Sequence, residues 1–243
     1  MRWRWLVVAV ALVGPVGADS GDSFTEGREL LARVVANRPA GDLKLLARLW
    51  ITRDRTVPLE VLIQNRPTET RTIYRLAATE LLVVQPLSAS PRFFRKGAGE
   101  LRGDARLASF GDSAIVYYDL GLGFLHWPVV SKLTTEKYRG RECYRLETAA
   151  ADEPFARARL WIDREYGALL RAELVDRDEN VARRLAVTSF RRVGEVWIPR
   201  GIEIARVPPG QSLPAQEKSR IEIYDGAVDL QLPAEWFDEA RFQ

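Results

Sequence analysis

Few residues of this 243-residue chain have the type and spacing that catalysis or metal binding needs. His126 is the only histidine, so a His-based triad would have to use it, and the sequence contains neither an HExxH motif nor a cluster of metal-ligand residues. Carboxylate pairs such as Asp152-Glu153 are typical of solvated turns. No glycine-rich pattern precedes a helix as it does in phosphate-binding loops. We therefore expect a protein that is not an enzyme and that uses no metal or other cofactor.

Cys143 is the only cysteine, so the chain has no internal disulfide to make. It alternates with Tyr144 and Arg145 in a pattern typical of a strand. An unpaired cysteine in such a place commonly behaves as a small apolar side chain. The pattern favours a buried, unreactive thiol over a reactive one.

The elements that must position any binding residue are strands. Four runs with a period of two follow one another with short polar turns between them: Ala158–Asp163, Leu169–Asp176, Val181–Val193 and Val196–Val207. Turns this short predict antiparallel neighbours. Apolar residues occur on both faces of these runs, so the sheet needs cover on both sides, or covers one side and keeps the other for a ligand.

Similar runs occupy most of the remaining chain. A four-strand meander is predicted over Leu43–Thr52, Val57–Gln64, Thr70–Leu76 and Glu80–Gln85, and further runs begin at Phe93 or cover Ser131–Tyr138, Glu142–Thr148 and Glu217–Tyr224. Gly97–Gly103 reads as a glycine-rich turn. Amphipathic spacing after a Ser or Asp cap predicts a helix over Asp22–Ala36, and a short helix is expected over Pro233–Phe242.

These patterns predict a mainly β fold with some α structure. We expect about eleven strands in one strongly curved antiparallel sheet, an incomplete β-barrel, with helices covering its concave face. The apolar, glycine-rich stretch Leu120–Pro128 has two interpretations. It is either a buried connection under the sheet or a lid at the mouth of a cavity.

The first 18 residues read as a secretory signal peptide. Arg2 and Arg4 form a basic start, Leu6–Val13 is an apolar core, and Val16-Gly17-Ala18 supplies the small residues of a cleavage site. The core is too short for a membrane span, which needs about 20 apolar residues. We predict cleavage after Ala18, a periplasmic protein, and one domain over residues 19–243.

Removal of this leader lowers the net charge of the protein. The full chain has 36 Lys and Arg against 33 Asp and Glu, and without Arg2 and Arg4 the balance is 34 against 33, or +1. Nucleic-acid binding relies on a concentrated positive surface that releases counterions from phosphates. A near-neutral, mixed surface predicts no nucleic-acid partner.

Several motifs are spread over nearly the whole mature chain. They are Tyr117-Tyr118-Asp119-Leu120, Gly140-Arg141-Glu142-Cys143-Tyr144-Arg145-Leu146, Leu160-Trp161-Ile162-Asp163, Val196-Trp197-Ile198-Pro199, and Leu232-Pro233 to Phe237. Together they resemble the outer-membrane lipoprotein-sorting proteins of the LolA-like superfamily. The resemblance implies an incomplete β-barrel, helices as a lid, and a hydrophobic cavity for the acyl chains of a lipoprotein or a lipid. It also implies an inner-membrane transporter and an outer-membrane acceptor as partners, with only peripheral membrane contact.

The resemblance suggests where such a cavity would lie. Apolar side chains of the strands and of the Leu120–Pro128 stretch are its expected lining: Leu45, Leu49, Val61, Ile63, Phe93, Phe94, Leu122, Phe124 and Trp127. Arg66-Pro67 to Arg71 is similar to the family's Arg-Pro-x-x-x-Arg stretch, which implies that Arg66 latches the lid. Thr70 and Thr72 stand where aromatic residues are usual, so a solvated turn residue is the alternative for Arg66.

Two functions of different classes follow from this resemblance. The first is a soluble carrier that shuttles lipidated clients or lipids towards the outer membrane. The second is an envelope sensing or scaffolding module on the same fold, which binds a lipidated or misfolded protein partner. Bound lipid in the purified protein would favour the carrier, and a copurifying protein would favour the sensor.

Overall fold

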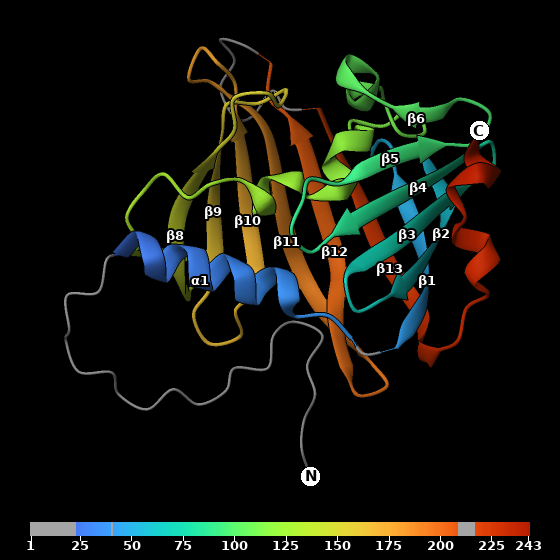
Figure 1. The fold of residues 1–243 in the computed structure, drawn as a ribbon, viewed down its shortest axis with the longest axis horizontal. Coiled ribbons are helices and arrows are strands. Elements are labelled where there is room, and N and C mark those ends of the chain that lie inside the picture. Colours follow the sequence, from blue (N-terminus) through green and yellow to red (C-terminus); the bar gives the residue numbers. More distant parts are fainter. Residues whose placement is uncertain (1–22, 40, 209–216) are drawn as a thin grey trace.

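A computed structural model describes residues 23–39, 41–208 and 217–243, and its main feature is one antiparallel sheet (Figure 1). The sheet has 13 strands in the spatial order β6-β5-β4-β3-β2-β1-β13-β12-β11-β10-β9-β8-β7. The strands are β1 (Asp42–Trp50), β2 (Thr56–Asn65), β3 (Glu69–Leu76), β4 (Thr79–Pro86), β5 (Arg92–Arg95), β6 (Gly99–Leu101), β7 (Thr134–Tyr138), β8 (Arg141–Ala149), β9 (Arg157–Asp163), β10 (Leu169–Val175), β11 (Val181–Val193), β12 (Val196–Arg206) and β13 (Glu217–Leu230). The mainly β class is confirmed.

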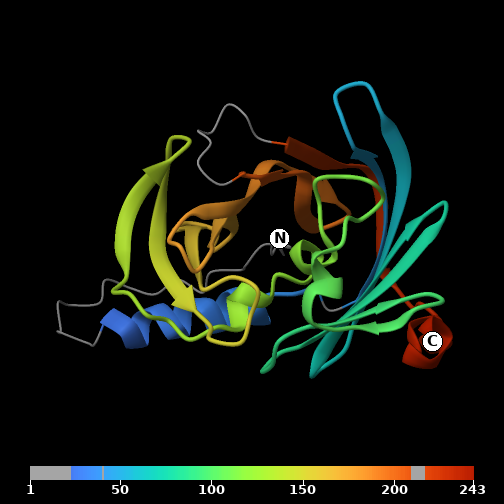
Figure 2. The same cartoon turned by 90° about the horizontal axis from the view of Figure 1, so that it is seen from above.

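The sheet consists of two meanders that meet in its middle. Strands β1 to β6 form one and β7 to β13 form the other, and β1 pairs with β13 where they join. The sheet curves strongly and does not close, since β6 and β7 are its two edges (Figure 2). Bulges in the pairing, as between Leu46 and Ala47, increase the local bend. Curvature gives the sheet a hollow inner face and an outer face.

The predicted number of about eleven strands was too low. Strand β6 lies inside the Gly97–Gly103 stretch that reads as a turn, where Gly97 and Gly99 have φ angles of 76° and 71°. These glycines make the tight β5–β6 connection, because only glycine adopts such angles without strain. Strand β13 extends to Leu230, beyond the predicted end at Tyr224.

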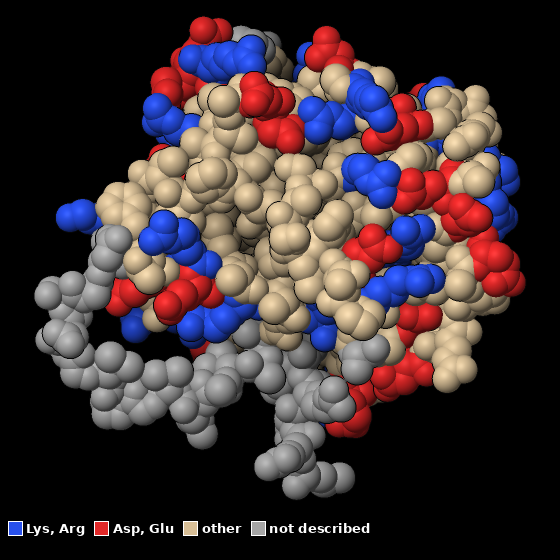
Figure 3. Space-filling view, viewed as in Figure 1, with Lys and Arg blue, Asp and Glu red and all other residues tan. Residues whose placement is uncertain are grey.

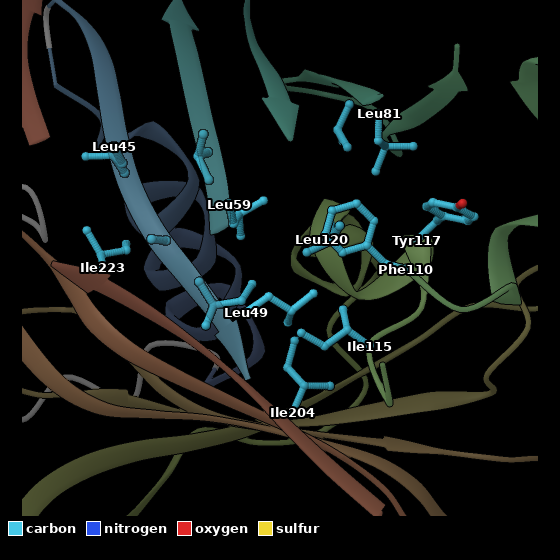
Figure 4. Packing of buried hydrophobic residues seen from close by; sticks show 14 of the residues in the cluster. Leu45, Leu49, Leu59, Leu81, Phe110, Ile115, Tyr117, Leu120, Ile204 and Ile223 are labelled. Atoms are coloured by element: carbon cyan, nitrogen blue, oxygen red, sulfur yellow. The ribbon is translucent and has the colours of Figure 1, made fainter. Parts of the chain in front are cut away.

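The inner face carries two apolar clusters. The first includes Leu49 of β1 and Ile204 of β12, and it is filled by Phe110, Ile115 and Tyr117 from the segment between β6 and β7 (Figure 4). That segment contains the short 3-10 helices η1 (Gly103–Leu107), η2 (Tyr117–Gly121) and η3 (Gly123–His126).

The second cluster packs the one α-helix of the described residues, α1 (Ser23–Ala36), against the other meander. Leu30 and Leu31 of α1 join Leu160 of β9, Leu174 of β10 and Phe124 of η3. The amphipathic helix predicted for this stretch is therefore present, and its apolar face is the buried one. Partly buried Leu185 of β11 packs against both clusters.

The helix predicted at the end of the chain is absent. Residues 233–242 form two short 3-10 turns, η5 (Ala234–Phe237) and η6 (Glu239–Phe242), and Asp238 between them accepts a hydrogen bond from Ala240 N. Their Phe237 and Phe242 pack on Leu62 and Val84, which point to the outer face. Several helices in the hollow are thus not confirmed, because this aromatic segment covers the outside of the sheet.

Candidate functional site

An apolar chamber lies on the inner face beside the filled core. Its volume is about 340 Å³. Side chains from β1, β2, β11, β12 and β13 line one wall, and α1 and the η2–η3 segment line the other: Leu45, Val61, Ile63, Leu185, Ile202 and Ile223 on the sheet, with Val34, Leu120, Leu122 and Leu125 opposite. Figure 3 shows a hollowed, mostly uncharged surface above α1, with Lys, Arg, Asp and Glu gathered around it. The chamber can bury an apolar ligand but offers few polar anchors.

The mouth of the chamber is more polar. This second part of the cavity has a volume of about 280 Å³ and shares Leu45, Ile63 and Leu122 with the chamber. It adds a set of polar side chains from the end of α1, from β2 to β4 and from η3: Asn37, Arg38, Asn65, Thr70, Thr72, Gln85 and His126. The two parts together are apolar inside and polar at the opening, as small-molecule sites commonly are.

The η2–η3 segment is held over the hollow by side chains of the sheet. Tyr74 Oη donates to Leu120 O at 3.2 Å, and Gln85 Nε2 donates to Gly121 O at 2.6 Å. Gly121 lies so close to β5 that a Cβ atom there would be 2.5 Å from Phe93 Cζ. Gly121 therefore permits close packing of this apolar stretch on β5. Burial raises the pKa of Tyr74, so its phenol stays protonated and can donate this hydrogen bond.

A buried ion pair fixes the other end of the same segment. Arg183 of β11 and Asp119 of η2 are 6% and 5% exposed, and Arg183 Nε donates to Asp119 Oδ1 at 2.6 Å. Arg183 Nη2 also donates to Ala114 O, and Val116 N donates to Asp119 Oδ2. Both carboxylate oxygens of Asp119 and two of the three guanidinium nitrogens of Arg183 have partners, so the pair ties the segment to the sheet.

The structure brings four of the predicted cavity residues together. Leu45, Val61, Ile63 and Leu122 line the chamber. Leu49 and Phe93 are fully buried in the filled part of the inner core and do not line it.

The other three predicted residues lie elsewhere. Phe94 points to the outer face with Phe237, because adjacent strand residues point to opposite sides. Phe124 and Trp127 pack in the cluster under α1. Three further lining residues, Leu185, Ile202 and Ile223, were not identified from the sequence. Their strands were predicted from alternation, but alternation does not show which face of the sheet is the inner one.

The predicted latch, Arg66, does not reach the cover of the cavity. Its exposed side chain donates to Gln64 Oε1 at 2.8 Å, as the turn-residue alternative expected. Instead, Arg38, two residues after α1, connects the end of this helix to β3 and to the turn before it. Its Nη1 donates to Thr70 Oγ1 at 2.7 Å and its Nη2 donates to Arg66 O at 3.0 Å. In the sequence, the one indication of this role is the position of Arg38 and Pro39 just after the end of α1.

Residues that could take part in catalysis or metal binding do not gather in the cavity. His126 is half-buried at the mouth, and burial lowers its pKa. Cys143 is fully buried, as predicted, and it lies on the outer face, where burial raises the pKa of its thiol. Glu153 is not a solvated turn residue, because its side chain is 14% exposed and pairs with Arg106 at 2.9 Å. Within the ranges that the structure describes, no group of three or more His, Cys, Asp or Glu is placed to hold a metal ion.

Comparisons with known proteins agree with this architecture. A family model described as "-like: Uncharacterized protein" matches residues 99–243, more than half of the chain. A search of curated proteins found no match. Among the described residues, no helix is long and apolar enough to span a membrane.

Solved structures share the fold. A DUF1329 family protein from Desulfovibrio piger has a TM-score of 0.75 at 17% identity, covering 91% of this chain and 100% of its own. A domain provisionally described as an outer membrane lipoprotein-sorting protein domain, from Vibrio parahaemolyticus, has a TM-score of 0.71 at 12% identity, covering 89% and 95%. A LolA superfamily protein from Nitrosomonas europaea has a TM-score of 0.59 at 12% identity, covering 88% and 96%. The predicted LolA-like fold is confirmed.

Proposed function

We propose that this chain, which belongs to the family whose model matches residues 99–243, is a periplasmic carrier of acyl chains. It binds the acyl chains of lipoproteins or lipids in the inner-face cavity and shuttles them towards the outer membrane. Residues 1–18 direct export and are removed after Ala18, although they lie outside the described residues. An inner-membrane transporter delivers the client, and an outer-membrane acceptor receives it.

The unfilled apolar chamber is the observation that carries this proposal. Apolar side chains form nearly all of its lining, and its volume of about 340 Å³ is within the range of ligand sites. Each methylene group that enters such a site gains about 0.8 kcal/mol. Within the chamber, the acyl chain itself therefore binds through burial of apolar surface, which suits a carrier that must later release it.

The cover of the chamber supports loading and release. Leu122 and Leu125 reach the chamber from a segment of short 3-10 turns, and Val34 reaches it from a single helix. Apart from the Arg183–Asp119 pair, which holds the start of the segment, side-chain hydrogen bonds from the sheet reach it from Tyr74, Gln85 and Thr148. Displacement of the segment and the helix exposes the chamber while the strand pairing stays intact.

Binding of a fluorescent fatty acyl probe by the purified protein tests the proposal. Val61 and Ile63 both line the chamber, and a charge at either position opposes acyl burial. Ile63→Glu is the more informative variant, because Ile63 is partly exposed whereas Val61 is 5% exposed in the core. We expect Ile63→Glu to weaken probe binding at least about tenfold, equivalent to about 1.4 kcal/mol.

Thr135→Glu is the matched control, because Thr135 is exposed on the edge strand β7. It adds the same charge far from the cavity and should leave probe binding unchanged. Absence of probe binding by the unaltered protein would overturn the carrier proposal. The sensing or scaffolding function would then be the one to pursue, through proteins that copurify from the native host.

A further inference from the structure

The mouth of the cavity carries an unbalanced positive charge. Among the described residues that line it, Arg38 is the only one that is charged at neutral pH, because burial lowers the pKa of His126 and keeps its imidazole uncharged. No Asp or Glu belongs to this lining. An apolar tail entering the chamber therefore brings its other end to a cationic opening.

Arg38, which is half-buried, differs from the buried Arg183 in its partners. Arg183 of β11 is neutralised by Asp119, which lines the chamber, whereas Arg38 has no carboxylate within salt-bridge distance among the described residues. Its terminal nitrogens donate only to Thr70 Oγ1 and to the carbonyl oxygens of Arg66 and Pro67. These neutral acceptors fix the guanidinium in place but leave its charge available to a ligand.

Two donors at this position have no acceptor. Arg38 Nε and Asn37 Nδ2 are both buried and make no hydrogen bond with any described residue. Asn37 lines the chamber as well as the mouth, so its amide lies where the two parts join. Buried donors without an acceptor are costly, and the oxygens of an anionic headgroup at the mouth would supply acceptors for them.

We infer that the cavity takes an acyl amphiphile with an anionic headgroup, a carboxylate or a phosphate, whose chain fills the chamber and whose head binds Arg38 and Asn37. The inference rests on the proposed carrier function and narrows its ligand class. Acyl compounds with a neutral headgroup lack the negatively charged oxygen that pairs with Arg38. The chamber is near the small end of ligand sites, which suits one chain rather than several.

Binding of cis-parinaric acid and of its methyl ester to the purified protein tests this inference. Both probes fluoresce and carry the same chain, so their difference in affinity reports the headgroup alone. We expect the acid to bind about tenfold more tightly than the ester, the usual effect of a hydrogen bond to a charged group. Oleate and lysophosphatidate should displace the acid, monooleoylglycerol should not, and the stronger of the two anions identifies the headgroup.

Variants of the two neighbouring arginines separate recognition from structure. Arg38→Gln should weaken binding of the acid about tenfold and leave the ester unchanged, and Arg38→Lys should restore part of the preference. Arg66→Gln is the control, because that exposed side chain does not line the mouth. It should leave both affinities unchanged.

Equal affinity of the unaltered protein for acid and ester would overturn the inference and leave the carrier function intact. An equal loss for both probes in Arg38→Gln would also overturn it, since Arg38 would then only hold the cover. Binding of neither probe would overturn the carrier function itself.

Discussion

The two ends of the inner face have similar strands and different contents. At one end, Phe110 and Ile115 are fully buried among residues of β1, β2 and β12, and the space is filled. At the other end, Ile202 and Ile223 face a chamber whose far side is lined by Val34 of α1 and by Leu122 and its neighbours. The apolar strand pattern is the same, so the connecting segment decides which end is core and which is a binding site.

The boundary between the ends lies in the η2–η3 segment. Gly121 packs against Phe93 on the filled side, and Leu122 reaches the chamber on the other. Leu122 has a φ of 49°, an unusual backbone angle for leucine, and its position separates the two 3-10 turns. The comparison can be tested by truncating side chains on each side of this boundary.

Phe110→Ala should have the largest effect, because it empties the filled end. We expect the free energy of unfolding to fall by about 3–5 kcal/mol, as large core truncations do. Ile202→Ala at the open end should cost only about 1–2 kcal/mol, since no close-packed neighbour is lost on its chamber side. Urea denaturation of both variants measures this, and equal losses would contradict the division into core and chamber.

Asp119→Asn should have the next largest effect. It removes the charge that Arg183 binds and leaves a buried cation without a counter-ion, at a cost of about 2–3 kcal/mol in unfolding free energy. Asp178→Asn in an exposed turn is the control and should change stability by less than about 0.5 kcal/mol. Denaturation curves that coincide for the two variants would show that the pair does not hold the segment.

Cys143→Ser should cost about 1 kcal/mol, because it replaces a small buried apolar group with a polar one outside the inner face. Acyl probe affinity should not change. Labelling of Cys143 by a thiol dye in the folded protein, or loss of probe binding in the variant, would be the contrary result.

The smallest effect concerns His126 and pH. Burial lowers the pKa of His126 below its ordinary value of 6.5. The unfolded chain then takes up this proton at a higher pH than the folded chain does, so stability falls as the pH drops below about 6.5. His126→Gln should reduce this pH dependence between about pH 7 and 5.5, which thermal denaturation at several pH values measures. An unchanged slope would show that the site is not desolvated.

Much of the fold could be predicted from the sequence because alternation is a local signal. The runs around Leu45, Val61 and Leu185 have a period of two, and each became a strand in the predicted antiparallel order. Short elements were missed where local signals conflict, as in the glycine-rich β5–β6 connection. The closing segment has helix-compatible residues, but packing of Phe237 and Phe242 on the outer face determines its 3-10 turns.

The site was less predictable because it depends on contacts between distant segments. Phe93 and Phe94 are adjacent in sequence, and only the strand pairing decides that Phe93 faces inwards. Arg38 binds Thr70, 32 residues away, and no spacing rule connects them. The family resemblance drew attention to Arg66, whose exposed position resembles that of an ordinary turn arginine.

Because the edges of the sheet are open, the strands alone do not fix the size of the cavity. In a sheet closed on itself, strand number and stagger fix the diameter, so the interior has one width. Here no hydrogen bonds join β6 to β7, and the distance between these edges is governed by α1 and the segment over residues 103–133. Capacity is therefore a property of loops and side chains, and it can diverge between relatives while the strand ladder stays the same.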